Sequence, residues 1–278
     1  MWMDIDAYLR RIAYRGSPTP SPETLRDLHV AHLRAVPFEN LSIHLGEPIV
    51  LDDDALFGKI VARRRGGFCY ELNGLFAALL RALGFEVSML SAGVMNPAGR
   101  FGPEFDHMTL LVRCPDPWLA DVGFGDGFLE PLRLHAGEEQ PAGWRLSAHR
   151  GRWLLSRALE GGAPRPRYRF TTTPRAYADY ARMCAFHQRS PKSPFTRQRL
   201  CTIATAEGRV TLTGMRLLTS RGSWKAEQVL ADEVEWTEVL RETFGIALPH
   251  RPGSGPVSGA PESFSPLRGS PEQGRGQT

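Results

Sequence analysis

The sequence lacks the features of a membrane protein, a metal centre or a disulfide-linked scaffold. It has no run of eighteen apolar residues, which excludes a transmembrane helix. Its four cysteines stand at positions 69, 114, 184 and 201, with no CxxC pair and no spacing typical of metal ligands. The opening segment Met1–Asp6 carries acids where a secretory signal carries positive charge. We therefore expect no signal peptide, no metal, and reduced thiols in a cytoplasm.

Lysine is scarce as well, so the net charge of +4 comes almost wholly from arginine. The densest basic run is Arg63–Arg65, which is too short to indicate a nucleic-acid partner. The mild positive excess would help to attract a polyanionic ligand, but it serves solubility equally well. Hydrophobic residues make up 42% of the 278 residues and charged residues 23%. Such a composition is typical of a globular protein with one large domain or a few small ones.

The first part of the chain, from residue 4 to about residue 85, has the pattern of helices. Ser21 before Pro22 marks a helix start, with a capping oxygen followed by a proline in the first turn. The clearest helix contains Leu72–Leu83, where large apolar residues recur at steps of three and four. Gly84 then supplies the left-handed residue that ends it.

From about residue 86 to residue 173 the apolar period changes to two, which predicts short strands separated by Gly and Pro clusters. An antiparallel barrel or sandwich is typical of this pattern. The expected strands cover 87–90, 108–113, 118–122, 144–147, 153–156 and 168–172.

Residues 174–248 show a mixed pattern that ends in a last helix from Asp232 to Phe244, with Glu235 completing a capping box. Before it we expect a helix near 176–187 and strands near 201–205, 209–213 and 216–219. Residues 249–278 have too little apolar content to fold and are predicted to be a disordered tail.

The segment with the most chemical content is Arg65–Asn73, which reads RGGFCYELN. Its two glycines allow a sharp turn, and Cys69 then falls in the first turn of the leucine-rich helix. Unpaired N–H groups and the helix dipole favour a thiolate there, and the same N–H groups are candidates to hold an oxyanion. A buried cysteine that acts only as a small apolar side chain is the alternative.

His107 and Asp121 strengthen the catalytic interpretation of that cysteine. His107 opens one predicted strand, Asp121 closes the next, and a tight turn near Cys114–Pro115 joins them. If these strands form a hairpin, the two residues lie roughly opposite each other, with Cβ atoms about 5 Å apart. The carboxylate could then orient the imidazole as a general base. The alternative is a turn acid and a strand-end histidine, and the other seven histidines have no such hairpin.

A glycine-rich loop, Gly123–Gly127, follows directly and reads GFGDG. Such a loop can present backbone N–H groups to an anion or let a flat ligand approach. It does not match a dinucleotide fingerprint, because the third glycine is misplaced and no helix obviously follows.

Several segments, taken together and in order, resemble the arylamine N-acetyltransferase family. They are Val36–Leu41 (VPFENL), Arg65–Gly74 (RGGFCYELNG), Asp106-His107 and Asp121–Gly125 (DVGFG). Weaker similarity continues to about residue 245, so most of the chain before the predicted tail is covered.

The resemblance implies an α+β fold in three parts: a helical bundle over 1–85, an antiparallel β-barrel over 86–173 and an α/β lid over 174–248. It implies Cys69 as the nucleophile, His107 as the base and Asp121 as the residue that orients the base. It also implies an internal ion pair between Glu39 and Arg65 that supports the site. The implied and expected substrate contacts are Phe68, Gly123, Phe124, Gly125 and Phe195.

The activity implied by the resemblance is acetylation of aromatic amines and hydrazines, a reaction of xenobiotic metabolism. Acetyl-coenzyme A is the implied donor, and an acetyl-cysteine intermediate gives ping-pong kinetics. Other functions stay open at this point. An amide synthase of the same family would transfer a larger polyketide acyl chain. A cysteine hydrolase of the papain or transglutaminase type would release a free carboxylate. A binding protein would keep the fold without catalysing a reaction.

Overall fold

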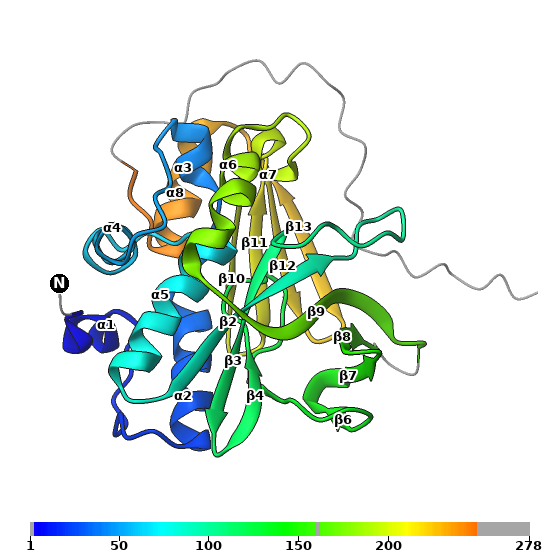
Figure 1. The fold of residues 1–278 in the computed structure, drawn as a ribbon. Coiled ribbons are helices and arrows are strands. Elements are labelled where there is room, and N and C mark those ends of the chain that lie inside the picture. The colour runs from blue at the N-terminus through cyan, green and yellow to red at the C-terminus, as the bar shows by residue number, and fades with distance from the viewer. Residues whose placement is uncertain (1–2, 159–161, 249–278) are drawn as a thin grey trace, which may run out of the picture.

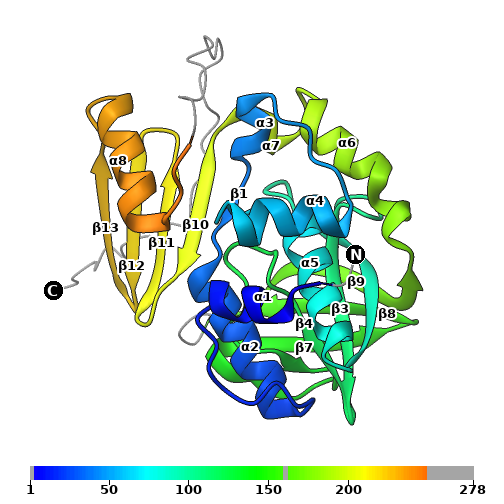
Figure 2. The same ribbon diagram turned by 90° about the vertical axis from the view of Figure 1, so that its left-hand side faces the viewer.

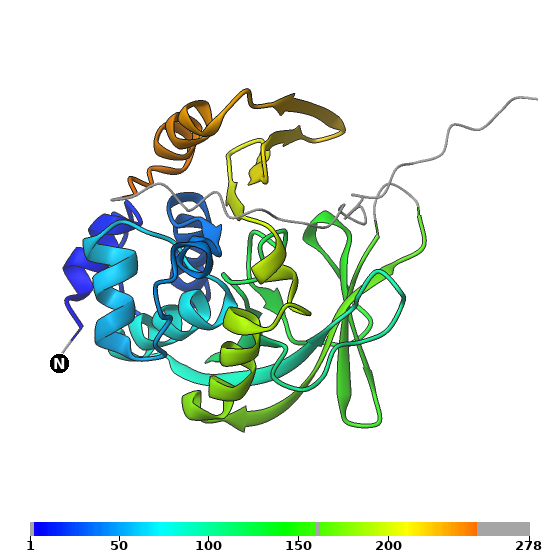
Figure 3. The same cartoon turned by 90° about the horizontal axis from the view of Figure 1, so that it is seen from above.

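The computed structural model describes residues 3–158 and 162–248, and the chain is α+β, as expected, with two antiparallel sheets and a group of helices (Figure 1). The eight-stranded sheet curves into a nearly closed barrel, and the five-stranded sheet stands apart from it with a helix on its face (Figure 2). Seen from above, the N-terminal helices and the barrel lie side by side, and the five-stranded sheet runs along one side of both (Figure 3). No helix among the described residues has the length and apolar character needed to cross a membrane.

Helices dominate the first part of the chain. Their bounds are α1 Ile5–Arg11, α2 Pro22–Ala35, α3 Leu41–Leu45, α4 Asp53–Phe57, the π-helical turn η1 Gly58–Ala62 and α5 Cys69–Ala82. The predicted start at Ser21 is confirmed, because its hydroxyl accepts a hydrogen bond from the backbone N–H of Thr24. Gly84, just beyond α5, has the expected positive φ, at 93°. Helix α5 is buried along nearly its whole length and packs on strands β2 and β3.

The barrel sheet has the strand order β5-β4-β3-β2-β9-β8-β7-β6, with every neighbouring pair antiparallel. Its strands are β2 Glu86–Val94, β3 His107–Cys114, β4 Asp116–Ala120, β5 Leu132–Arg133, β6 Glu139–Gln140, β7 Trp144–His149, β8 Arg152–Arg157 and β9 Arg165–Arg175. All six strands predicted here are present. The two-residue strands β5 and β6 were missed, because two residues are too short to show an alternating pattern.

The second sheet has the order β1-β10-β11-β12-β13. Its strands are β1 Phe38–Glu39, β10 Leu200–Ala204, β11 Gly208–Thr213, β12 Arg216–Arg221 and β13 Trp224–Val229. The helices of this region are η3 Tyr177–Tyr180, α6 Ala181–Arg189, α7 Pro194–Arg197 and α8 Glu233–Phe244. Helix α8 begins at Asp232, whose carboxylate accepts from the N–H groups of Val234 and Glu235, and it buries Trp236 and Leu240 in the core of this sheet. Strand β13 was not predicted, because it is exposed along its whole length and shows no apolar alternation.

Strand β1 connects the N-terminal helical part of the chain to the second sheet. It pairs Phe38 with Thr202 and Glu39 with Cys201, so a strand from the helical part belongs to the C-terminal sheet. The sequence-based division at residues 85, 173 and 248 stays a prediction. The disordered tail expected over residues 249–278 lies outside the described residues.

Candidate functional site

Cys69 is the first residue of α5. The turn before it is held by a close backbone approach at Gly66 and by a hydrogen bond from Phe68. A Cβ on Gly66 would lie 2.0 Å from the carbonyl oxygen of Pro37, so only glycine fits there. The side chain of Glu71 accepts a hydrogen bond from the N–H of Phe68, at 3.0 Å. This bond caps α5 at the residue before Cys69.

The Cys69 side chain lies against strand β3, at Met108, the residue that follows His107. The backbone N–H of Met108 forms a hydrogen bond to the Cys69 sulfur and lowers the pKa of the thiol. Burial acts more strongly in the opposite direction, so the pKa of Cys69 is well above its usual value. The expectation that the helix start favours an isolated thiolate is therefore opposed by the surroundings of the sulfur. A thiolate at Cys69 therefore requires a positively charged group nearby, formed when that group takes up the thiol proton.

His107 and Asp121 are in direct contact, at 2.7 Å between Nε2 and Oδ2, and both are buried. Their placement differs by two residues from the predicted hairpin. Strand β3 pairs Leu110 with Ala120 and Cys114 with Asp116, so the turn is centred on Pro115 and position 121 comes level with Thr109. His107 and Asp121 are thus diagonal neighbours on one face, a separation that a histidine side chain can span.

The Asp121 carboxylate has four hydrogen-bond donors. Oδ1 accepts from Asn73 Nδ2 at 2.8 Å and from the N–H of Gly123 at 3.1 Å. Oδ2 accepts from His107 and from the hydroxyl of Tyr168, at 3.0 Å. Burial alone would raise the pKa of Asp121, but His107 and the other donors outweigh it and the pKa is lowered. The carboxylate is therefore held in its charged form.

A second histidine, His29, supports Asp121 from behind. Its Nε2 lies 3.0 Å from the backbone N of Asp121, and its Nδ1 lies 2.8 Å from the carbonyl oxygen of Leu129. The backbone N–H of Asp121 can only donate, and the carbonyl of Leu129 can only accept. His29 is therefore neutral, with its proton on Nδ1. Burial lowers the pKa of His29 to about 4.

No pattern in the sequence pointed to His29 or Tyr168, because each reaches Asp121 from a distant segment. Asn73 lies within the recognised cysteine segment, and its role could have been inferred from its place one turn after Cys69 on α5. Its amide also donates to Met108 O and accepts from the N–H of Val122, which ties α5 to both strands of the hairpin.

Gly123 lets the Asp121 segment approach Cys69 closely. A Cβ at this position would lie 2.7 Å from Cys69 Cα and 2.7 Å from Asn73 Nδ2. The backbone after Asp121 therefore touches the helix start that carries Cys69. Helix α5 and the hairpin of β3 and β4 are brought together at this point.

The expected substrate-contacting aromatics fall into two groups. Phe124 packs edge-on to His107, with ring centroids 5.1 Å apart, and is partly exposed. Phe195, from α7, packs on Phe68 at 5.8 Å and on Phe38 at 6.0 Å. Phe68 is completely buried, and its contact with substrate stays a prediction. Gly125 packs close to Thr202 and has a positive φ of 76°.

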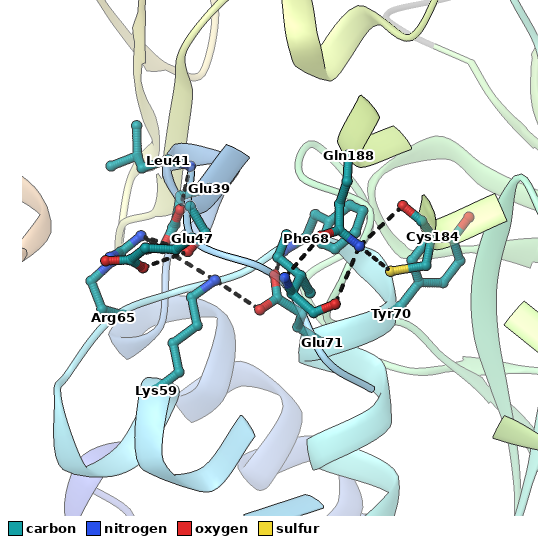
Figure 4. Close-up of polar contacts among 12 residues, drawn as sticks. Glu39, Leu41, Glu47, Lys59, Arg65, Phe68, Tyr70, Glu71, Cys184 and Gln188 are labelled. Atoms are coloured by element: carbon teal, nitrogen blue, oxygen red, sulfur yellow. Dashed lines mark hydrogen bonds and ion pairs between the residues drawn. The ribbon is translucent and has the colours of Figure 1, made fainter. Parts of the chain in front are cut away.

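A buried network of charges lies beneath the cysteine segment (Figure 4). The implied pair is present: Arg65 Nη2 lies 2.9 Å from Glu39 Oε1. Lys59, whose role was not predicted, has its Nζ 2.7 Å from Glu71 Oε1 and 3.9 Å from Glu39 Oε1. Burial raises the pKa of Glu71 despite Lys59, whereas the two cations outweigh burial at Glu39 and lower its pKa. This network fixes the turn before Cys69.

No group of three or more His, Cys, Asp or Glu side chains that could hold a metal ion occurs within residues 3–158 and 162–248. The arrangement at Cys69, His107 and Asp121 contains a thiol, an imidazole and a fixed carboxylate. Such a set can form and resolve a thioester without further groups.

Known proteins resemble this chain over most of its length. A family profile described as N-acetyltransferase matches residues 21–252. Arylamine N-acetyltransferase 2 of Mus musculus is 36% identical over 275 aligned residues, which cover 88% of this chain and 95% of the relative. An arylamine acetyltransferase structure from Mycobacterium smegmatis superposes with a TM-score of 0.83 at 34% identity, over 88% of this chain and 93% of the other. The Mycobacterium marinum arylamine N-acetyltransferase in complex with CoA gives 0.81 at 33% identity, over 87% and 93%.

Proposed function

Because the chain belongs to the arylamine N-acetyltransferase family and is an acetyltransferase, we propose that it acetylates aromatic amines and hydrazines from acetyl-coenzyme A through an acetyl-Cys69 intermediate. The observation that carries the proposal is the contact between His107 and the charged carboxylate of Asp121, together with the hydrogen bond from the backbone of the next residue, Met108, to the sulfur of Cys69. We take Cys69 as the nucleophile, His107 as the base and Asp121 as the positioning residue.

In the first half-reaction, the thiol proton of Cys69 passes to Nδ1 of His107, since Nε2 is used by Asp121. The sulfur attacks the acetyl carbonyl carbon, and the carbon–sulfur bond of the donor breaks. Coenzyme A leaves as its thiol with the proton that His107 returns. Burial opposes a lone thiolate at Cys69, so proton transfer and attack are coupled, and Asp121 balances the imidazolium that forms.

In the second half-reaction, the amine nitrogen attacks acetyl-Cys69 and loses a proton to His107. The amide forms, the bond between the sulfur and the acetyl carbon breaks, and the sulfur recovers its proton. Aromatic amines and hydrazines suit this route because they are largely unprotonated at neutral pH, unlike alkyl amines. Burial of the triad side chains keeps water from the thioester and favours transfer over hydrolysis.

Initial-rate kinetics with acetyl-coenzyme A and an arylhydrazine test the proposal. We expect parallel lines in double-reciprocal plots and exchange of labelled coenzyme A into acetyl-coenzyme A without any acceptor. Intersecting lines with no exchange would exclude an acyl-enzyme. Acetate release at a rate independent of the amine would instead identify a hydrolase.

A further inference from the structure

Three arginines from three different strands converge on one carboxylate beside the proposed reaction centre. Arg167 of β9 forms an ion pair with Asp126, which lies in the glycine-rich loop. Asp126 also stabilises the charges of Arg157, at the end of β8, and of Arg209, on β11. This arginine cluster, Arg157, Arg167 and Arg209 around Asp126, therefore joins the barrel, the loop and the second sheet.

The cluster holds more positive charge than its carboxylate can balance. Arg167 pairs directly with Asp126, and the charges of Arg157 and Arg209 also interact with this one acid, whose side chain is 59% exposed. Burial lowers the pKa of Arg157 and of Arg209; Asp126 opposes this, and in each case a neighbouring arginine lowers the pKa further. All three arginines are partly buried, so the excess charge is only partly screened by water.

The arginines are also held in place. The Arg157 guanidinium stacks over Trp144, with 5.0 Å to the ring centroid, and its Nε donates to Ala142 O at 3.2 Å. Arg209 donates to Thr202 Oγ1 at 3.3 Å. The buried Nε of Arg167 has no hydrogen-bond partner among the residues that the structure describes. A fixed group of donors with spare capacity is suited to an incoming anion.

One aromatic ring separates the cluster from the reaction centre. The Arg167 guanidinium lies 5.3 Å from the centroid of Phe124, and that centroid lies 5.1 Å from the His107 ring. A ligand bound at Cys69 can therefore extend along Phe124 to the arginines. The pantetheine arm of coenzyme A is flexible and long enough to cover this separation.

We propose that the arginine cluster is an anion subsite that holds a phosphate group of the acyl donor during the first half-reaction. This inference rests on the proposed function, because it takes acetyl-coenzyme A as the donor. A phosphate matches the cluster better than a carboxylate does, since the excess charge left after Asp126 is more than one carboxylate would neutralise. Asp126 competes for the same guanidinium groups and moderates the affinity.

The test compares donors with and without phosphates on the complete enzyme. The acceptor is aniline, and the donors are acetyl-coenzyme A, acetyl-dephospho-coenzyme A and S-acetylpantetheine. The variants are Arg157→Gln, Arg209→Gln and Asp126→Asn, and Arg152→Gln, an exposed arginine at the other end of β8, is the matched control. Turnover of S-acetylpantetheine reports whether each variant keeps an intact reaction centre.

We expect both arginine variants to raise the KM for acetyl-coenzyme A about tenfold, the size of one charge-assisted hydrogen bond. Their kcat/KM for S-acetylpantetheine should match that of the wild type and of the control. Asp126→Asn should act in the opposite sense and lower the KM for acetyl-coenzyme A. An effect that disappears with the dephospho donor assigns the 3′-phosphate, and one that persists assigns the pyrophosphate.

Equal losses with acetyl-coenzyme A and S-acetylpantetheine would overturn the subsite. A loss seen only when 4-aminobenzoate replaces aniline would also overturn it, because the cluster would then hold the acceptor. A wild-type enzyme that transfers acetyl from none of the three donors would contradict the proposed function itself. Failure of the subsite and failure of the proposed function therefore give different results.

Discussion

The Nε2 atom of His107 lies 2.7 Å from Oδ2 of Asp121, and Oδ1 of the same carboxylate is held by Asn73 and Gly123. Because one imidazole nitrogen is committed in this way, the other is the one that can serve the Cys69 thiol. Asp121 is therefore expected to act through the orientation of His107, and residues that hold Asp121 should affect the rate without touching the substrate.

Tyr168→Phe should lower kcat/KM about tenfold, because it removes one hydrogen bond to the Asp121 carboxylate while keeping the ring that packs on Phe124. Thr109→Val is the matched control, since the Thr109 hydroxyl contacts Tyr168 and Ala120 O but not Asp121. Equal effects of the two substitutions would contradict the role given to the Tyr168 hydroxyl. Initial rates with acetyl-coenzyme A and an arylhydrazine provide the measurement.

Gly123→Ala should lower the rate of acetyl transfer about a hundredfold, as expected when reacting groups are displaced by about an ångström. The added Cβ would lie 2.7 Å from Cys69 Cα, so the helix start and the loop must separate. Gly58→Ala, where no atom lies within 4 Å of the added Cβ, should leave the rate unchanged. A fully active Gly123→Ala enzyme would show that this close approach is not needed.

Lys59→Met should destabilise the fold by about 3–5 kcal/mol, because it leaves the buried Glu71 carboxylate without its cation. Adding Glu71→Gln should restore most of that loss, since the neutral side chain needs no partner and can still accept from Phe68 N. Urea denaturation of the single and double variants measures the coupling. Additive losses would mean that the two side chains do not stabilise each other.

His29 should make the folded state sensitive to acid. The pKa of His29 is lowered by burial from 6.5 to about 4, so the folded protein binds fewer protons than the unfolded chain in that interval. Its contribution to stability is complete above the unfolded pKa and is lost as pH falls toward about 4. The two pKa values differ by the equivalent of about 3 kcal/mol.

The check is the free energy of unfolding of the wild type and of His29→Gln between neutral pH and pH 4. We expect the advantage of the wild type to shrink by about 3 kcal/mol on acidification. The neighbouring His32, whose pKa is lowered mainly by burial and to a smaller extent by His29, is present in both proteins, so the main part of its effect cancels in the difference. Parallel curves for the two proteins would contradict a neutral, buried His29.

The extent to which sequence anticipated structure depended on whether the deciding contact was local. The starts at Ser21 and Asp232 are confirmed, because a cap involves residues two or three positions apart. Strand β1 was missed, because its two residues become a strand by pairing with β10, more than 150 positions away in the chain.

The candidate site shows the same division. His107 and Asp121 lie on one hairpin, so their proximity followed from the turn, although the register differed by two residues from the expected one. His29 and Lys59 reach the site from other helices, and no pattern in the sequence marks a buried polar side chain whose partner is remote.

Peptide mass spectrometry of the enzyme mixed with acetyl-coenzyme A tests the central claim most directly. We predict an acetyl group on Cys69 that forms without an acceptor and is removed by an arylhydrazine. The acetyl group should be absent in Cys69→Ala and should form far more slowly in Asp121→Asn. Acetyl transfer by Cys69→Ala at the wild-type rate, or turnover with no acetyl on the Cys69 peptide, would contradict the account.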